Sequence, residues 1–362
     1  MIQKQKLSDI TKDNRYLLYC SHLYSLAILR PLQKVIWERG GETAWFFDNP
    51  DAGHKHLNQD EKLLDDVETV KKFNPNAVFV PGNIVPDFFP GIKIEVFHGI
   101  ANDYMGKKGH FRIRGFFDLY CTRSDKETAQ FNEFATKKRH FEVIETGWPK
   151  LDTLFSHSND SRLREKMGIT KPIVLYASTF SPSMTSAPHL LEIVKNLSKK
   201  GKYYWFITLH PKMPEKIIAK YKNLGGANLT FFEGHENVYS LLRSADVMLC
   251  DTSSIFCEFM MLDKPVVTYR TKVPGPHVID VQDKMMIESA IEMALKRPPN
   301  LMKSARKFID RLHPYRDGLS SNRVLYAANH LISTGISHLK PKPMNLLRKW
   351  RIRKRLRYYH LN

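Results

Sequence analysis

Short apolar runs alternate with segments of helical spacing along most of this chain. The segment at 25–41, SLAILRPLQKVIWERGG, ends at a glycine pair and carries apolar residues at helical spacing: Leu26, Leu29, Leu32 and Ile36. This spacing predicts an amphipathic helix. The apolar runs of the first half are RYLLYC (15–20), AWFFD (44–48), NAVFVPG (76–82), KIEVFHG (93–99), FDLYCTRSD (117–125) and FEVIETGWP (141–149). Apolar strands that alternate with helices predict βα units and a parallel sheet buried on both faces.

The same alternation returns after a polar, charged stretch at 155–171, FSHSNDSRLREKMGITK. Its apolar runs are PIVLYAST (172–179), YWFITLHP (204–211), NLTFFEG (228–234), DVMLC (246–250) and DKPVVTYR (263–270). Helix-like segments separate these runs and follow the last of them. The pattern predicts an α/β protein with two similar halves, a boundary near 155–171 and a helical C-terminal end.

Four small polar residues, Asp251-Thr252-Ser253-Ser254, lie between the run at 246–250 and an apolar, helix-like segment. In open parallel sheets, ligands bind beyond the carboxyl ends of the strands, and helix N-termini offer unpaired N–H groups to anions. Serine hydroxyls add further donors, so these residues indicate a phosphate site. A helix N-cap is the alternative, because Asp, Thr and Ser are favoured there in any protein. The local sequence leaves both interpretations open.

Polar residues follow other predicted strands as well. They are His98-Gly99, Gly147-Trp148-Pro149, Ser178-Thr179 and His210-Pro211. A lone histidine is more often structural than catalytic, but two at strand ends in opposite halves favour a role in chemistry. Gly99 also leaves room for a ligand to approach the backbone.

The charge of the chain indicates an anionic partner. The 362 residues include 56 Lys and Arg against 37 Asp and Glu, a formal net charge of +19. Nine of these cations and no acid lie between Lys340 and Arg357, and 19 − 9 still leaves the rest at +10. Such a charge favours a nucleotide, a phosphopolymer, nucleic acid or lipid headgroups, without choosing among them.

The expected compartment follows from apolar stretches and cysteines. No apolar stretch approaches the ~20 residues that cross a bilayer, and the first residues are polar. The four cysteines, at 20, 121, 250 and 257, form no CxxC pair. This pattern favours buried, reduced thiols. We therefore expect a cytoplasmic protein or one on the membrane surface that faces the cytosol.

The strand-end motifs, taken in order, resemble those of the CDP-glycerol glycerophosphotransferase family, the primases and polymerases of teichoic-acid-like polymers. The matching residues are Phe97-His98-Gly99, Gly147-Trp148-Pro149 with Asp152, Ala177-Ser178-Thr179, His210-Pro211, Asp251-Thr252-Ser253-Ser254 with Leu262-Asp263-Lys264-Pro265, and Asp317-Gly318 with Arg323. No single motif is specific, but the ordered set is. Ser178 and Thr252 depart from the usual Pro and Tyr. The first quarter of the chain matches no motif, which makes it a candidate for the acceptor site.

The resemblance implies a GT-B architecture, with two Rossmann-like domains and an active site in the cleft between them. It places an acceptor-side domain at 1–160, a donor-side domain at 161–318, a helix that packs back on the first domain at 319–339 and a polybasic tail at 340–362. It implies a transferase that moves glycerol phosphate from CDP-glycerol, or a similar CDP-alditol, to a hydroxyl of a lipid-linked or polysaccharide acceptor and releases CMP. Glycerol versus ribitol, the acceptor, and single addition versus polymerisation stay open.

Roles for individual residues follow from the same resemblance. His98 is the expected general base for the acceptor hydroxyl, because an unperturbed imidazole titrates near ~6.5. His210 is expected to offset charge on the leaving phosphate. The expected donor-binding residues are Thr179, Asp251, Ser253, Ser254 and, with weaker support, Lys212. For Asp251 we favour a helix cap over a ligand contact. Gly99 and Asp152 are assigned to the acceptor side.

Metals and cofactors are not required by the sequence. It contains no metal-ligand cluster and no acidic pair at metal spacing, whereas a basic, serine-rich site can hold a pyrophosphate by itself. We therefore expect no cofactor and no essential metal. Mg²⁺ is compatible with the reaction but is not implied.

The tail LLRKWRIRKRLRYYHLN (346–362) combines cations with aromatic residues. Each cation near an anionic membrane is worth about 1 kcal/mol, and the family's acceptors are commonly lipid-linked. We expect the tail to bind the inner face of the bacterial membrane through Arg348, Lys349, Trp350, Arg351, Arg353, Lys354 and Arg355.

The apolar residues of the tail form two sides on a helical wheel rather than one stripe. One side consists of Leu346, Leu347 and Trp350, and the other of Ile352, Leu356 and Tyr359. A solvated or nucleic-acid-binding tail is the alternative.

Two other functions fit parts of the sequence. A GT-B glycosyltransferase that uses a nucleotide sugar shares the fold and the diphosphate chemistry, and Glu258 is its candidate carboxylate. A non-enzymatic binder of nucleic acid or anionic polysaccharide is supported by charge alone. That second function leaves His98 and His210 unexplained, and no RNA-recognition motif is present. We expect no nucleic-acid partner.

Overall fold

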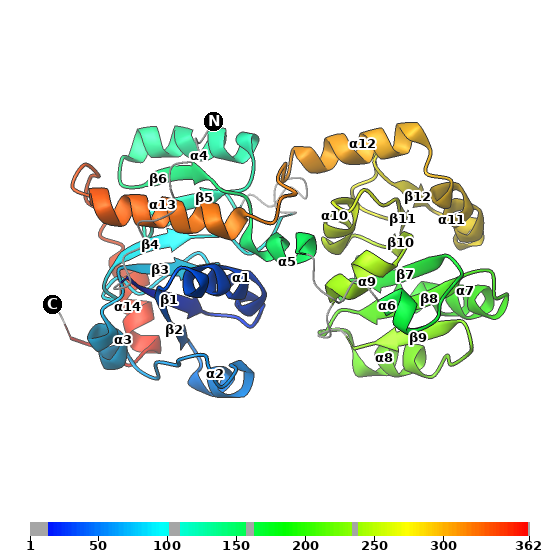
Figure 1. The fold of residues 1–362 in the computed structure, drawn as a ribbon, viewed down its shortest axis with the longest axis horizontal. Helices are drawn as coiled ribbons and strands as arrows, with labels where there is room; N and C mark the ends of the chain where they lie inside the picture. Colours follow the sequence, from blue (N-terminus) through cyan, green and yellow to red (C-terminus); the bar gives the residue numbers. More distant parts are fainter. Residues whose placement is uncertain (1–13, 101–108, 157–162, 234–237, 361–362) are drawn as a thin grey trace. The chain divides into compact units, whose positions relative to one another are not determined.

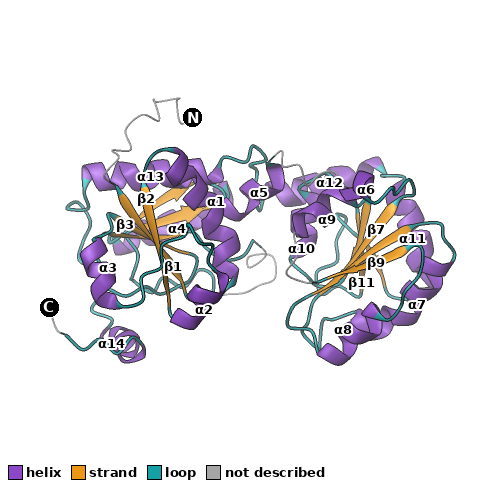
Figure 2. Ribbon diagram, turned by 60° about the horizontal axis from the view of Figure 1, so that its bottom comes forward, coloured by secondary structure: helices purple, strands orange, loops and turns teal. Residues whose placement is uncertain are grey.

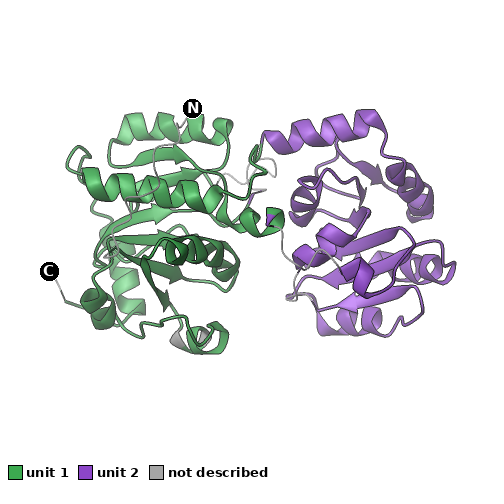
Figure 3. Ribbon diagram, in the orientation of Figure 1, with its two compact units in different colours: residues 1–99, 108–155, 312–362 green, residues 100–107, 156–311 purple. Residues whose placement is uncertain are grey.

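The chain divides into two compact units (Figure 3). The computed structural model describes residues 14–100, 109–156, 163–233 and 238–360. Unit 1 comprises 1–99, 108–155 and 312–362, and unit 2 comprises 100–107 and 156–311. Unit 1 is therefore assembled from three separate stretches of the sequence, and the last of them lies beyond the whole of unit 2.

Unit 1 is built on a sheet of six parallel strands in the order β2-β1-β3-β4-β5-β6. The strands are β1 (Arg15–Cys20), β2 (Glu42–Phe47), β3 (Ala77–Val80), β4 (Ile92–Glu95), β5 (Leu119–Thr122) and β6 (Glu142–Glu145). Each apolar run predicted in the first half overlaps one of them, although β2 and β4 begin before their runs. The central strands β1, β3, β4 and β5 are buried almost throughout, as expected for a parallel sheet covered on both faces.

Helices surround this sheet (Figures 1 and 2). They are α1 (Tyr24–Glu38), α2 (Pro50–His56), α3 (Val67–Phe73), α4 (Asp125–Lys138), η1 (Pro149–Leu151), α5 (Asp152–Phe155), α13 (Ser320–Thr334) and α14 (Leu346–Arg355). Helix α1 buries Ile28, Leu29, Leu32 and Ile36. Leu29, Leu32 and Ile36 are among the apolar positions that predicted this helix from the sequence. Helix α1 also packs against α13, which comes from the far end of the chain.

Helix α14 lies within the polybasic tail and packs against the rest of unit 1. Ile352 on the helix and Tyr358 after it are buried in the core of unit 1. Arg353 reinforces this packing because its guanidinium pairs with Asp87 at 3.2 Å. The described part of the tail is therefore an element of the fold and not a solvated extension.

The opposite face of α14 points away from the core. Leu346, Leu347 and Trp350 are 65%, 76% and 55% exposed. The two apolar sides of the helical wheel thus have different environments, because Ile352 and Leu356 pack into unit 1 and the other side is open. This difference explains why the sequence shows no single apolar stripe. Tyr359 follows the helix and is exposed, so it does not share the packing of its predicted side.

Unit 2 has the same layered architecture around a second parallel sheet, in the order β12-β11-β10-β7-β8-β9. Its strands are β7 (Ile173–Ser178), β8 (Tyr204–Leu209), β9 (Leu229–Phe232), β10 (Val247–Cys250), β11 (Val266–Tyr269) and β12 (Ile279–Val281). Counted within the unit, the order is that of the doubly wound Rossmann fold. The predicted α/β class with two parallel sheets is confirmed. Strand β12 was not predicted, because it has three residues in a polar context.

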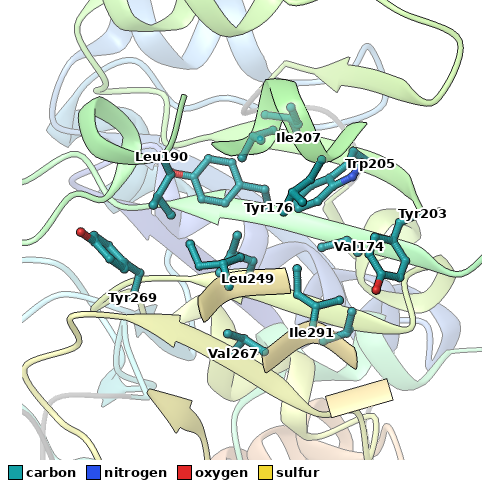
Figure 4. Packing of buried hydrophobic residues seen from close by; sticks show 14 of the residues in the cluster. Val174, Tyr176, Leu190, Tyr203, Trp205, Ile207, Leu249, Val267, Tyr269 and Ile291 are labelled. Carbon is teal, nitrogen blue, oxygen red and sulfur yellow. The ribbon is translucent and has the colours of Figure 1, made fainter. Parts of the chain in front are cut away.

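The helices of unit 2 are α6 (Leu163–Lys166), α7 (Ala187–Lys199), α8 (Glu215–Lys222), α9 (Val238–Ser244), α10 (Ile255–Met260), η3 (Lys284–Met286), α11 (Ile287–Leu295) and α12 (Pro299–Asp310). The core combines strand and helix residues, among them Val174, Tyr176, Trp205, Leu249 and Ile291 (Figure 4). Truncation of such a buried aromatic side chain typically costs about 3–5 kcal/mol. This rigid core fixes the strand ends at which the candidate site residues lie.

The lengths of the helices and the state of the cysteines complete the description of the fold. Among the helices that the structure describes, none has the length and apolarity to cross a membrane. The four cysteines are buried and unbridged.

Candidate active site

The strand order of unit 2 reverses between β7 and β10, which are neighbours in the sheet. Open α/β sheets bind ligands beyond the carboxyl ends of the strands at such a switch point. The segments that follow these two strands are 179–186 and 251–254. The predicted donor-binding residues Thr179, Asp251, Ser253 and Ser254 all lie in them. The topology thus brings together residues that are more than 70 positions apart.

Asp251 joins the two segments through its buried carboxylate. It accepts hydrogen bonds from the Ser178 hydroxyl at 2.6 Å, the Thr179 N–H at 3.0 Å, and the Ser186 N–H and hydroxyl at 2.8 and 2.9 Å. Burial raises the pKa of Asp251, and these hydrogen bonds oppose the rise. Ser254, not Asp251, occupies the N-cap position of α10, and it makes no side-chain cap bond.

The predicted cap at Asp251 is therefore wrong for the helix that follows it. The carboxylate instead fixes the segment that leads into α7, with Ser186 at the N-cap position of that helix. The sequence could not reveal this partner, because the pairing depends on the neighbouring positions of β7 and β10. Asp251 thus holds the backbone of Thr179 in place.

Thr252 fixes a third segment at the same edge of the sheet. Its hydroxyl accepts the N–H of Lys272 at 2.9 Å, and the Lys272 ammonium reaches the Ser183 hydroxyl at 3.4 Å. Lys272 is exposed and follows β11, so its cation lies at the carboxyl edge of the sheet. Sequence reasoning missed it, although a cation directly after a recognised strand was the available signal.

His210 follows β8, next to β7 in the sheet. Its Nδ1 accepts the Lys212 N–H at 3.0 Å, so Nδ1 carries no proton and the neutral ring has its proton on Nε2. Desolvation of the ring and, secondarily, the Lys212 cation lower the pKa of His210. The ring packs against Phe180, with centroids 4.4 Å apart. This arrangement presents a neutral Nε2–H donor.

His98 follows β4 in unit 1 and has the opposite arrangement. Its Nδ1 lies 3.1 Å from the Pro81 carbonyl oxygen, which can only accept, so Nδ1 carries the proton. Burial lowers the pKa of His98 below its usual value, and the Pro81 bond opposes the shift. The ring is therefore neutral near pH 7, with Nε2 available to accept a proton.

The backbone before His98 is held in an unusual conformation. Phe97 has φ of +56°, in the left-handed region that residues other than glycine rarely adopt. The Trp148 indole N–H donates to the Phe97 carbonyl at 3.1 Å, and the Trp148 backbone N–H donates to His313 Nε2 at 2.9 Å. Trp148 was recognised in the sequence without a role. The structure connects it directly to the residue that precedes His98.

A buried ionic cluster supports the ring of Phe97. The ring lies 4.9 Å from that of His110 and 5.4 Å from the Arg123 guanidinium. Both groups contact the Glu127 carboxylate. Burial alone raises the pKa of Glu127, but Arg123 and His110 outweigh this effect and hold it at about 2. Glu127 is thus an anion that fixes both groups in place.

Asp152 has a structural partner in the same unit. Its carboxylate accepts the N–H groups of Ser320 and Ser321 at 2.8 and 2.6 Å, at the start of α13. Burial raises its pKa and these hydrogen bonds oppose the rise. Both carboxylate oxygens thus hold the start of α13, and the expected acceptor-side role of Asp152 stays a prediction. Gly99 is half-buried directly after His98, and its role stays a prediction.

The late motif Asp317-Gly318 and Arg323 is internal to unit 1. Arg323 pairs with both carboxylate oxygens of Asp317, at 2.8 and 3.1 Å, and donates from Nε to the Thr146 carbonyl. It connects the start of α13 to the end of β6. Within the described ranges, no group of three His, Cys, Asp or Glu side chains could hold a metal ion.

The chain is similar in sequence to enzymes of teichoic acid synthesis. The model of the CDP-glycerol:poly(glycerophosphate) glycerophosphotransferase family matches residues 94–275. Teichoic acid glycerol-phosphate primase of Bacillus subtilis (strain 168) is 27% identical over 234 residues, which are 59% of this chain and 58% of that protein. Teichoic acid poly(glycerol phosphate) polymerase of Bacillus spizizenii (strain ATCC 23059 / NRRL B-14472 / W23) is 26% identical over 221 residues, 57% and 53% of the two chains. The chain thus spans less than two thirds of these relatives' length.

Solved structures show the same fold. The wall teichoic acid polymerase TagF aligns with a TM-score of 0.63 at 14% identity, over 91% of both chains. A glycosyltransferase from Rickettsia africae ESF-5 aligns with a TM-score of 0.55 at 13% identity, over 90% of this chain and 100% of that one. The expected GT-B-like fold class is confirmed. Because one fold carries different activities, function must be argued from the site.

Proposed function

Because the chain belongs to the CDP-glycerol:poly(glycerophosphate) glycerophosphotransferase family, we propose that it transfers a glycerol phosphate, or a related alditol phosphate, from a CDP-activated donor. The acceptor is a hydroxyl of a lipid-linked or polysaccharide molecule, and CMP is released. The observation that carries the proposal is the pair of strand-end histidines with opposite tautomers. One can accept a proton at Nε2, and the other can donate from Nε2 while neutral.

The proposed reaction assigns a base to unit 1. The acceptor oxygen attacks the phosphorus that bears the alditol, its proton passes to His98 Nε2, and the bond from that phosphorus to the CMP oxygen breaks. A base whose pKa lies near or below the working pH is in the correct state for this step. Burial lowers the pKa of His98 and so favours the neutral ring near neutral pH. In the neutral ring, the Pro81 bond holds the proton on Nδ1 and leaves Nε2 available as the acceptor.

Unit 2 is the proposed donor side. Hydroxyls of Thr179, Ser253 and Ser254 and the cations of Lys212 and Lys272 lie on segments at the carboxyl edge of its sheet. Donors fixed before the reaction stabilise a transferring phosphoryl group more effectively than donors that must reorganise. Asp251 and Thr252 provide this fixation. His210 Nε2–H then donates to an oxygen of the departing CMP phosphate.

The nucleotide-sugar glycosyltransferase stays the second candidate, because it shares this fold. Its candidate carboxylate is not suitably placed, however. The Glu258 residue is only 4% exposed, on the buried side of α10. A sugar hydroxyl could contact it only after a rearrangement of unit 2. The phosphotransferase therefore fits the described residues better.

Membrane association completes the proposal. The open face of α14 combines Leu346, Leu347 and Trp350 with exposed cations at Arg351 and Lys354. Apolar side chains flanked by cations suit an anionic lipid surface. We propose that this face contacts the inner face of the cell membrane, where a lipid-linked acceptor is available.

A donor screen tests the proposed function. Calorimetry and CMP release are measured with CDP-glycerol, CDP-ribitol and UDP-glucose, each with EDTA and with MgCl₂. We expect a CDP-alditol to bind, and His98→Ala to keep donor binding while it loses CMP release. His54→Ala, which removes an exposed histidine from the same unit, is the matched control. Binding of UDP-glucose alone would support the glycosyltransferase, and activity only with Mg²⁺ would contradict the metal-free site.

A further inference from the structure

Three aromatic rings form a row at the carboxyl edge of the sheet of unit 1. The Tyr24 centroid lies 5.3 Å from that of His22 and 5.4 Å from that of His98. His22 and Tyr24 follow β1, whereas His98 follows β4, so the row joins distant parts of the sequence. It places two residues from the motif-free first quarter of the chain beside the proposed base.

The row lies where this sheet changes direction. The strand order β2-β1-β3-β4 reverses between β1 and β3, and ligands bind at such points in open α/β sheets. The segments after these strands approach closely, since a Cβ built on Gly82 would lie 3.2 Å from the Ser21 hydroxyl. The Pro81 carbonyl in the same segment fixes the His98 tautomer. The proposed base, on the segment after β4, thus contacts the segments that follow β1 and β3 at the switch point of unit 1.

Tyr24 is available to a ligand. It is 41% exposed and the neighbouring Leu23 is 48% exposed, and neither belongs to the apolar core of unit 1. Among the residues that the structure describes, none forms a hydrogen bond with the Tyr24 hydroxyl. Burial of part of the side chain raises its pKa to about 12, so the phenol stays a neutral donor. A partly exposed aromatic side chain with an unused hydroxyl suits a ligand that offers both C–H groups and hydroxyls.

We propose that Tyr24 and His22 form the acceptor subsite, in which a polyol or sugar packs its C–H face on Tyr24 and directs its reacting hydroxyl to His98 Nε2. This inference rests on the proposed function, because it takes His98 as the base. The ligand beside that base is the one that loses a proton, which is the acceptor and not the donor. The diphosphate-binding groups, by contrast, belong to unit 2.

The experiment varies the acceptor at saturating CDP-glycerol and measures CMP release by Tyr24→Ala, Tyr24→Phe and His22→Ala. Two soluble probes distinguish the polyol from the sugar: a glycerol phosphate trimer and methyl N-acetylglucosaminide. Saturation-transfer NMR records binding of both probes independently of turnover. Tyr359→Ala is the matched control, because it removes a tyrosine that is 63% exposed elsewhere in unit 1.

We expect Tyr24→Ala to raise the KM of one probe at least ten-fold and to weaken its NMR signal, while Tyr24→Phe has a smaller effect. The donor KM and the acid limb of the pH profile should stay unchanged. A raised donor KM would mean that Tyr24 binds the nucleotide instead. A lower kcat with a shifted acid limb would mean that it only supports the His98 ring. Either result overturns the subsite, as does wild-type protein that binds neither probe.

Failure of the proposed function would differ from failure of the subsite. In the first case, wild-type protein does not bind CDP-glycerol in calorimetry and releases no CMP. In the second, wild-type protein binds CDP-glycerol and one probe normally, and Tyr24→Ala behaves as Tyr359→Ala does.

Discussion

At the scale of single residues, the two strand-end histidines engage opposite ring nitrogens. His98 donates from Nδ1 to a carbonyl, and His210 accepts at Nδ1 from a backbone N–H. These bonds leave a proton acceptor in unit 1 and a neutral donor in unit 2. The sequence indicates both residues as chemical candidates, but it cannot assign their tautomers, because the deciding partners are backbone groups positioned by the fold.

The tautomers predict the shape of the pH profile. His98 must be neutral to act as a base, and its lowered pKa places the loss of kcat/KM below the usual ~6.5 as the pH falls. His210 donates as a neutral ring, so it adds no loss at alkaline pH. We therefore expect kcat/KM to rise through the acid limb and then stay level to about pH 9. A bell-shaped profile whose alkaline limb disappears in His210→Gln would contradict this assignment.

Trp148 is predicted to position His98 without contacting a substrate. Trp148→Phe removes the indole N–H that holds the Phe97 carbonyl, so the strained backbone before His98 can shift. Because misplacement of a catalytic group by about 1 Å can cost ~100-fold in rate, we expect kcat to fall roughly 10- to 100-fold with both KM values unchanged. Steady-state kinetics measures this split.

The control for Trp148 lies elsewhere in unit 1. Trp37 also donates an indole hydrogen bond, to the Thr43 hydroxyl at 2.7 Å, and lies on α1. Trp37→Phe should leave kcat unchanged. Equal losses in the two variants would indicate general destabilisation and contradict the positioning role.

At the scale of elements, one carboxylate fixes the segment between β7 and α7. Asp251→Asn replaces a charged acceptor of four hydrogen bonds by a neutral amide. Buried hydrogen bonds to charged groups are worth about 1.5–3 kcal/mol, so we expect a loss of stability of that order. We also expect donor affinity to fall at least about ten-fold, because the donor-binding segments loosen. Denaturant unfolding and calorimetry measure the two effects.

Asp246→Asn separates stability from binding. Asp246 accepts the Ile173 N–H at 2.7 Å and pairs with Arg164, at the amino end of β7. Its loss should destabilise unit 2 without a change in donor affinity. A similar loss of affinity in both variants would mean that Asp251 acts only through stability.

The packing of helix α14 decides which variants can test the proposed membrane contact. Truncation after residue 339 removes Ile352 and Tyr358 from the core of unit 1, so it would disturb the fold as well as the surface. The double variant Leu347→Ser and Trp350→Ser changes only exposed side chains. We expect it to lose binding to phosphatidylglycerol vesicles at physiological salt while CMP release from soluble substrates continues.

Met285→Ser is the control for the membrane variant, because Met285 is 70% exposed in unit 2. It should bind vesicles as wild-type protein does. Undiminished vesicle binding by the α14 double variant would contradict the proposed contact.

Most of the strands were predictable, because buried parallel strands are nearly continuous apolar runs. The runs at 172–179 and 204–211 contain β7 and β8 in full. Three-residue β12 has no such run. The roles of Asp251 and Asp152 were not predictable either, since their partners lie 65 and 168 positions away and meet them only through sheet order and the return of α13.

At the scale of the whole molecule, the donor site is predicted to belong to unit 2 alone. A ligand at 100 times its Kd stabilises its domain by about 2.7 kcal/mol, which raises the Tm of a domain of this size by roughly 5–10 °C. We expect CMP to shift only the calorimetric transition of unit 2. The transition of unit 1 is identified with Ile352→Ala, which should lower it. A CMP-induced shift of the unit 1 transition alone would contradict the assignment.

The discontinuity of unit 1 has a consequence for synthesis of the protein. A ribosome finishes all of unit 2 before it makes the stretch at 312–362. Until then, Trp148 lacks His313, Asp152 lacks the start of α13, and the sheet of unit 1 lacks two of its helices. A prematurely terminated chain could therefore fold a donor side but not a complete support for the proposed base. We therefore expect synthesis of the stretch at 312–362 to be a condition for the proposed turnover, and incomplete products to bind the donor nucleotide without using it.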